Sequence, residues 1–216
     1  MTDRSAPAAI ARLTDVAQRL GLDARALVAA APLLLQHVAR FGARNNLVGD
    51  YAAQAIVNEH LVESMTLAAL IADTGTVPRR LIDVGAGAGI ETMCLLLLWP
   101  EAIAVAVEPR QKRSIFIEVT ADAIGVGRRL QAVRHRAGQH DDQIGRHAFD
   151  LATSRATFAP EAWLTIASAF VAHDGRVAAH LGSQSITVDP AWQPLGARAV
   201  DGRPQHQVGL WRRATV

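Results

Sequence analysis

In residues 81–94, LIDVGAGAGIETMC, an apolar segment is followed directly by a loop that contains three glycines. Gly85, Gly87 and Gly89 allow the backbone to turn tightly and allow a ligand to approach it closely. Nucleotide-binding α/β proteins of several kinds need such a loop. This stretch therefore indicates a class of fold, and the residues around it must identify the ligand.

From Arg80 onward, short apolar runs alternate with segments of helical character. The expected strands are residues 80–84, 102–108, 129–135, 149–154, 175–181 and 207–213. Helices are expected to begin near Ile90, Arg110 and Pro160. This alternation predicts an α/β, Rossmann-like fold, with a mostly parallel sheet and helices on both faces. We expect residues 182–205, with three prolines, to be rich in loops before a last strand at the sheet edge.

The first 71 residues carry the apolar spacing of helices. One helical face is formed by Leu27, Leu34, Val38 and Phe41. Gly42 is expected to end that helix, and Asp50 is the expected N-cap of the next one. His60 and Ser64 lie one turn apart on this second helix, and we expect them to pack against the sheet.

The composition of the chain limits its architecture and its setting. Its 216 residues, half of them hydrophobic, fit one compact unit, which we divide into an N-terminal helical cap (1–75) and a Rossmann-like domain (76–216). A single cysteine, Cys94, excludes an intrachain disulfide and favours a reducing compartment. The run MCLLLLW is too short to cross a bilayer, and charged residues near the N-terminus argue against a signal peptide. We expect a soluble cytoplasmic protein.

The net charge is only +2, but the sequence pI is about 9.3 and nearly all basic residues are arginine. Arginine suits phosphate recognition, although an arginine-rich composition alone gives the same numbers. An RNA partner predicts one basic face, and its expected members are Arg40, Arg44, Arg128, Arg129, Arg134 and Arg136, whereas scattered arginines would favour a small-molecule substrate. Lys112 and Arg113 open a helix and face either phosphate or solvent.

The glycine spacing separates two classes of cofactor. The dinucleotide fingerprint is G-x-G-x-x-G, whereas this loop is G-x-G-x-G with Ile90 at the last dinucleotide position. The next residue, Glu91, would repel a pyrophosphate at the helix N-terminus. S-adenosylmethionine carries no phosphate and tolerates an acid there. Glu91 would also favour the helix dipole whatever the ligand.

Two acids at strand ends agree with S-adenosylmethionine. Asp83 can hold the loop amides or, through water, the ammonium of the methionine part. Glu108 ends the second strand, where it can accept both ribose hydroxyls, although NAD enzymes share that feature. Together with the glycine loop, they favour a class I S-adenosylmethionine-dependent methyltransferase.

Missing motifs narrow the methyl acceptor. The fourth strand is followed by ATSRATF rather than the D/N-P-P-Y/F turn of adenine amino methyltransferases. Cys94 lies at an expected core position, which argues against the cysteine nucleophile of C5 methylation. Asp141 and Asp142 fit surface loop acids better than a metal site, and the histidines lack metal-ligand spacing. An acceptor such as guanine N7, which has no proton to remove, remains, as do small-molecule nitrogens and thiols.

Six segments in order are similar to one family: RNNLVG, NEHLVESM, LIDVGAGAG, VEPRQKRSIFI, HRAG and LATSRA. The sequence resembles the GidB (RsmG) family of bacterial 16S ribosomal RNA guanine-N7 methyltransferases over residues 40–160. The resemblance implies S-adenosylmethionine as cofactor and a Rossmann-like sheet with an N-terminal helical cap. It also implies 16S rRNA in the small ribosomal subunit as partner, with a target guanine in the 530 loop at position 527. A monomer without metal is favoured.

The resemblance also implies roles for individual residues. The methionine and ribose side of the cofactor would be lined by Gly85, Gly87, Gly89 and Ile90. Glu108 would hold the ribose, and Ala137 and Gly138 would flank the adenine. Arg155, in TSRA, would lie beside the cofactor and the incoming base, where it positions the base and removes no proton. As a strand-end residue it could instead bridge to Asp150 or to a helix terminus.

The sequence departs from the usual family pattern at three places. Glu91 and Thr92 stand where members usually have Pro-Gly, and Gly138 replaces an acid beside the adenine. His180, in HLGSQ, stands at the position of the usual lysine. These changes leave two alternatives open, a divergent paralogue that methylates another RNA or a small molecule, and a non-catalytic protein that binds RNA or the ribosome.

Overall fold

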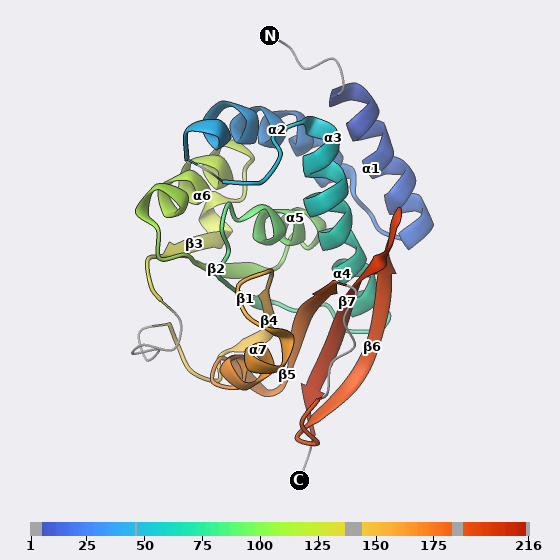
Figure 1. Cartoon of the computed structure of the whole chain (residues 1–216), viewed down its shortest axis with the longest axis vertical. Coiled ribbons are helices and arrows are strands. Elements are labelled where there is room, and N and C mark those ends of the chain that lie inside the picture. Colours follow the sequence, from blue (N-terminus) through green and yellow to red (C-terminus); the bar gives the residue numbers. More distant parts are fainter. Residues whose placement is uncertain (1–5, 46, 137–143, 183–187, 215–216) are drawn as a thin grey trace.

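The strand that precedes the glycine loop, β1 (Arg80–Val84), lies in the interior of a single sheet. The computed structural model describes residues 6–45, 47–136, 144–182 and 188–214. Within them, seven strands pair in the order β3-β2-β1-β4-β5-β7-β6 (Figure 1). The other six are β2 (Ile103–Val107), β3 (Leu130–Val133), β4 (Phe149–Ser154), β5 (Val171–Gly182), β6 (Trp192–Val200) and β7 (Arg203–Arg213).

Strands β1 to β5 are mutually parallel, whereas β7 runs antiparallel to β5 and β6 runs antiparallel to β7. The carboxyl ends of the parallel strands therefore share one edge of the sheet, where ligands bind in open α/β folds. The expected Rossmann-like sheet is confirmed.

The helices cover the two faces unequally. One main core joins a face of the sheet to α1 (Ala6–Leu20), α2 (Arg25–Asn45), α4 (Val62–Ala72), α5 (Ile90–Leu98) and α6 (Gln111–Ala123). The short α3 (Ala53–Ile56) and a π-helical turn (Val57–Leu61) lead directly into α4. On the opposite face α7 (Pro160–Ala167) packs in a smaller core. Figure 1 shows the N-terminal helices gathered around α5, so the expected cap shares its core with the sheet.

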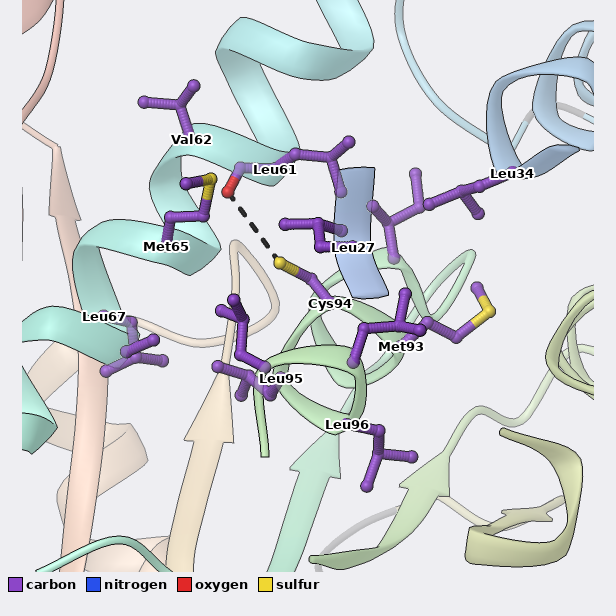
Figure 2. Close-up of a cluster of buried hydrophobic side chains, with 14 of the residues drawn as sticks. Leu27, Leu34, Leu61, Val62, Met65, Leu67, Met93, Cys94, Leu95 and Leu96 are labelled. Carbon is purple, nitrogen blue, oxygen red and sulfur yellow. Dashed lines mark hydrogen bonds between the residues drawn. The ribbon is translucent and has the colours of Figure 1, made fainter. Parts of the chain in front are cut away.

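Cys94 lies in the main core, as expected from its position in α5. Figure 2 shows it among Leu27, Leu61 and Met65, and its thiol lies 4.0 Å from the Leu61 carbonyl oxygen. Burial raises the pKa of this thiol above its usual value. A fully buried thiol with a raised pKa is a poor nucleophile, which agrees with the exclusion of C5 methylation.

Three expectations about element ends are wrong. Residues 192–200, expected as loop, form β6, and Pro194 is tolerated because an edge strand leaves one side of its backbone unpaired. Gly42 does not end α2, which continues to Asn45. A Cβ at Gly42 would lie 2.3 Å from a ring carbon of Tyr51, so this glycine allows a close contact. The N-cap is Ala52, whose amide donates to the Asp50 carboxylate at 2.9 Å.

The helix that spans Ala53–Ala72 is long and apolar enough to cross a membrane by length and composition. By length and composition it is a stronger candidate for a membrane span than the short run MCLLLLW. However, 72% of its most apolar stretch is buried inside the protein. That burial is the pattern of a core helix, because a helix packed by its own chain has little surface left for lipid.

Candidate functional site

A cavity of about 200 Å³ opens at the carboxyl ends of β1 and β4. The glycine loop between β1 and α5 provides one part of its wall, including Gly85, Gly87 and Ile90. Residues 47 and 48, which follow α2, provide another part. The N-terminal helical region thus helps to enclose the site. Its full lining is Leu47, Val48, His60, Asp83, Gly85, Ala86, Gly87, Ala88, Ile90, Glu91, Arg113, Arg155, Ala156 and Thr157.

Two glycines of the loop are required by their conformation and their surroundings. Gly85 has a φ of +78°, and a Cβ there would lie 2.1 Å from the Thr157 hydroxyl oxygen. Gly89 has a φ of +67° at the N-cap of α5, and a Cβ there would lie 2.8 Å from Ile117. Any other residue would be strained in this left-handed conformation. Gly89 does not line the cavity, and its observed role is to shape the loop at the start of α5.

Glu108, directly after β2, is buried beneath the glycine loop. One carboxylate oxygen accepts the Gly87 amide at 3.1 Å, and the other accepts the Arg110 amide at 2.9 Å. Arg113 of α6 lies 4.0 Å away and lines the cavity. Glu108 therefore joins the loop to the start of α6, although it does not itself line the cavity, so its expected contact with a ribose stays a prediction.

Asp83 and Glu91 are two buried carboxylates in the cavity wall. Burial and the neighbouring Glu91 charge raise the pKa of Asp83, whose carboxylate accepts the Thr92 hydroxyl at 2.6 Å. Because that pKa is about 7, Asp83 is partly protonated at neutral pH, and Arg113 and Arg155 line the same cavity, so the charges of the wall alone do not exclude a pyrophosphate. The ionised Glu91 carboxylate can attract the positive sulfonium or ammonium group of S-adenosylmethionine, which fits that cofactor.

Behind the cavity, Glu91 belongs to a cluster that was not expected from the sequence. Its carboxylate accepts the Thr153 hydroxyl at 2.5 Å and forms an ion pair with His180 Nε2 at 2.7 Å, without hydrogen-bond alignment. His180 Nδ1 lies 2.9 Å from Glu63 of α4. The alternation of side chains along β4 and β5 brings Thr153 and His180 to the face that packs on α4 and α5.

The charges in this cluster support one another. Burial alone would lower the pKa of His180, but Glu91 and Glu63 outweigh it and raise that pKa to about 10. Burial alone would raise the pKa of Glu63, but His180 and Arg155 hold it at about 2. His180 lowers the pKa of Glu91 in the same way. At neutral pH, His180 is therefore a cation between two carboxylates.

Arg155 comes directly after β4 and lines the cavity. Its guanidinium donates to the Glu59 carbonyl at 3.0 Å and lies 3.4 Å from the Glu63 carboxylate. The next residue, Ala156, has a φ of +55°, a strained value for a residue other than glycine. Arg155 does not bridge to Asp150, whose carboxylate accepts the amides of residues 79 and 80. Arg155 therefore lies at the same cavity as the glycine loop, and its contact with a cofactor or a base stays a prediction.

His60 also lines the cavity, although we expected it to pack against the sheet. It lies in the π-helical turn Val57–Leu61, and such turns are frequent at functional sites. Its Nδ1 contacts the Arg155 guanidinium, which can only donate, so the histidine accepts there and carries its proton on Nε2. Burial and the charge of Arg155 lower its pKa to about 3, and it is neutral at physiological pH.

The arginines of the expected basic face lie at opposite ends of the parallel strands. Arg128 is exposed and precedes β3, whereas Arg134 and Arg136 follow that strand at the edge with the cavity. Arg129 donates to three carbonyls at the end of α5, at 2.8 to 3.1 Å, which is a structural role. The expectation of one face with Arg128 and Arg129 is therefore wrong.

The remaining predicted residues fall into two groups. Exposed Lys112 lies in the first turn of α6, and exposed Arg40 of α2 lies with its guanidinium 5.5 Å from the Phe41 ring centre. Ala137 and Gly138, expected beside the adenine, lie outside the described residues. Residues 141 and 142 and the Arg44 side chain also lie outside them.

The comparison with protein families decides where this arrangement belongs. Residues 28–187 match the family model GidB, described as rRNA small subunit methyltransferase G. The chain belongs to this family. A GidB relative from Rhizorhabdus wittichii, named ribosomal RNA small subunit methyltransferase G, is 33% identical over 159 residues. One of the same name from Mycobacterium sp. strain JLS is 29% identical over 152 residues.

Each alignment covers 69% of this chain, and the matched stretches span about two thirds of the relatives, 68% and 64% respectively. A solved structure described as a putative O-methyltransferase from Klebsiella pneumoniae superposes with a TM-score of 0.59. That superposition covers 84% of this GidB chain and 90% of the other at 17% identity. It establishes the methyltransferase fold, and GidB membership establishes the S-adenosylmethionine-dependent class.

Proposed function

We propose that this protein transfers the methyl group of S-adenosylmethionine to N7 of a guanine in 16S rRNA of the small ribosomal subunit. The observation that carries the proposal is one cavity in a GidB chain, lined both by the glycine loop and by Arg155 with neutral His60. The loop would hold the cofactor, which supplies the methyl group. The other two side chains would meet the base.

The chemistry of N7 suits the groups around Arg155. Guanine N7 has a free lone pair and no proton, so methyl transfer to it needs no general base. Arg155 cannot accept a proton at all, and the accepting nitrogen of His60 is already used by Arg155. Catalysis would consist of holding N7 in line with the methyl group at a short distance.

Arg155 is the residue that we assign to positioning the base. A guanidinium can donate to guanine O6, the atom beside N7. Its contacts to the Glu59 carbonyl and the Glu63 carboxylate fix its direction without occupying all five of its N–H groups. N7 itself would remain free to react.

The RNA would approach along the cavity edge of the sheet. Lys112, Arg134 and Arg136 are exposed there, at the start of α6 and after β3. We propose that they contact phosphates, which contribute affinity without reading sequence. We place the reaction in the cytoplasm, where small ribosomal subunits are available as substrate.

The test is methyl transfer from labelled S-adenosylmethionine to purified small subunits that lack the modification, followed by mapping of the methylated base. We expect label at a single guanine N7, and we expect Arg155→Ala to abolish transfer while cofactor affinity stays close to that of the wild type. Arg213→Ala, at an exposed arginine on the last strand, is the matched control. Label on another RNA, or none with a folded protein that binds the cofactor, would contradict the proposal.

A further inference from the structure

Three ionisable side chains from three elements meet behind the cavity. Glu63 comes from α4, Glu91 from α5 and His180 from β5. The two nitrogens of the His180 ring lie 2.9 Å from Glu63 and 2.7 Å from Glu91, and all three side chains are 7% exposed or less. His180 therefore joins two helices that otherwise would face each other with like charges.

Such a cluster is not explained by stability alone. Removing charges from water is costly, and apolar residues of similar size often stabilise a core at least as well. What a buried ion pair does provide is fixed geometry for the groups that it holds. The question is therefore which part of the protein needs Glu63 and Glu91 at fixed positions.

Both carboxylates are connected to the cavity, Glu91 directly and Glu63 through Arg155. Glu91 itself lines the cavity. Glu63 uses one oxygen for His180, and its other oxygen lies 3.4 Å from the Arg155 guanidinium and 3.9 Å from that of Arg203. Without His180, Glu63 and Glu91 would repel each other, and we expect the anchor of Arg155 to move even though Arg203 still contacts it. His180 does not line the cavity, so any effect on the reaction must pass through its partners.

We propose that His180 is a positioning residue for methyl transfer, which fixes Arg155 at the cavity by holding Glu63 in place. The inference rests on the proposed function, because it assumes that Arg155 positions the acceptor base. It also accounts for charge: methylation leaves N7 of guanine positive beside the guanidinium, and Glu63 offsets that repulsion. An anchor that moved away from Arg155 would therefore impair both geometry and charge balance.

Two substitutions at His180 separate positioning from packing. His180→Gln can accept and donate hydrogen bonds but carries no charge, whereas His180→Lys restores a cation that can contact both carboxylates. We expect His180→Gln to lower kcat on small subunits by about tenfold to a hundredfold, as for a displaced positioning group. Its KM for S-adenosylmethionine should rise by a smaller factor than kcat falls, although Glu91, the other partner of His180, lines the cavity. His180→Lys should recover kcat to within about threefold of the wild type. His173→Gln, at an exposed histidine, is the control.

A second measurement needs no substrate. Arginine side chains labelled with ¹⁵N report whether the Arg155 guanidinium is held, and its signal is assigned by its loss in Arg155→Lys. We expect one sharp, slowly exchanging signal in the wild type and in His180→Lys, and a broadened or shifted one in His180→Gln.

The outcomes distinguish failure of this inference from failure of the proposed function. If the wild type shows the sharp Arg155 signal but does not methylate small subunits, the proposed function is contradicted. If the Arg155 signal is unchanged in His180→Gln, the positioning role of His180 is contradicted. Wild-type kcat in His180→Gln also overturns the inference. So does a parallel loss of cofactor binding and thermal stability that His180→Lys does not restore, because that pattern describes a purely structural residue.

Discussion

Glu108→Ala tests the arrangement of the cofactor site directly, and we expect it to weaken S-adenosylmethionine binding. The carboxylate lies under the glycine loop, 4% exposed, and accepts the amides of Gly87 and Arg110. Removing it leaves both donors without this acceptor and frees the loop from the end of β2. It would also remove the group that we expect to hold the ribose.

The size of the effect follows from the two hydrogen bonds that we expect the Glu108 carboxylate to accept from the ribose hydroxyls. A hydrogen bond to a charged group contributes about 1.5–3 kcal/mol, and two such bonds in one site are not additive. We therefore expect a loss of about 2–4 kcal/mol in binding free energy. This corresponds to a dissociation constant raised by about 30-fold to several hundredfold.

Titration calorimetry with S-adenosylmethionine measures the change. Glu118→Ala, at an exposed glutamate of α6, is the matched control and should bind as the wild type does. A cofactor analogue that lacks the ribose 2′-hydroxyl separates the two roles of Glu108. If the carboxylate holds the ribose, the analogue should bind more weakly only to the wild type. A change in dissociation constant below about threefold in Glu108→Ala, roughly 0.6 kcal/mol, would refute the reasoning.

Three other properties can be tested on the same protein. Gly89→Ala should lower the free energy of unfolding in urea by about 2–4 kcal/mol, from left-handed strain and overpacking. The pKa of His180 is raised from 6.5 to about 10 in the folded state. Its contribution to the free energy of unfolding is therefore fully present below pH 6.5. Stability in urea should fall as pH rises from there toward 10, and His180→Gln should flatten this slope between about pH 7 and 9, outside the ranges in which Asp83 and Cys94 also contribute. Reversing Lys112 and Arg134 to glutamate should flatten the salt dependence of small-subunit binding, by nearly one unit of log–log slope per lost phosphate contact, whereas Arg128→Glu should not.

The elements that the sequence predicted well are those whose signals are local. Leu81, Ile82 and Val84 give β1 apolar side chains on both faces because a central parallel strand is buried on both, and the glycine loop follows it directly. The β6 strand contains a proline and a glycine and is buried only at its two ends, because it lies at the exposed sheet edge. Its sequence therefore resembles a loop. Only pairing with β7, a contact of the folded chain, defines it as a strand.

The residues of the site differ in the same way, because some have a local signal in the sequence and others are brought in by contacts between distant parts of the chain. The positions of Asp83 and the loop glycines could be predicted because strand, turn and helix are consecutive in the chain. Glu63 could not, because it reaches Arg155 from a residue 92 positions away. His60 was assigned to packing because regular helical spacing places it toward the sheet, and the π-helical turn changes that direction. Alternation along each strand was available in the sequence, but only the register Thr153↔Ala178 of the folded sheet places Thr153 and His180 on one face.

Glu91 and His180 are two separate departures from the usual family pattern when each is considered alone, and together they are one feature. A glutamate in the first turn of α5 enters a buried space, where an unpaired carboxylate would be unstable. His180 supplies the cation, 2.7 Å away, from the strand that faces this turn. The two residues therefore compensate each other electrostatically and need no change of methyl acceptor to explain them. Exchanging only one of them should harm the protein more than exchanging both. A double-mutant cycle with Glu91→Gln and His180→Gln, read by urea unfolding, would measure that coupling.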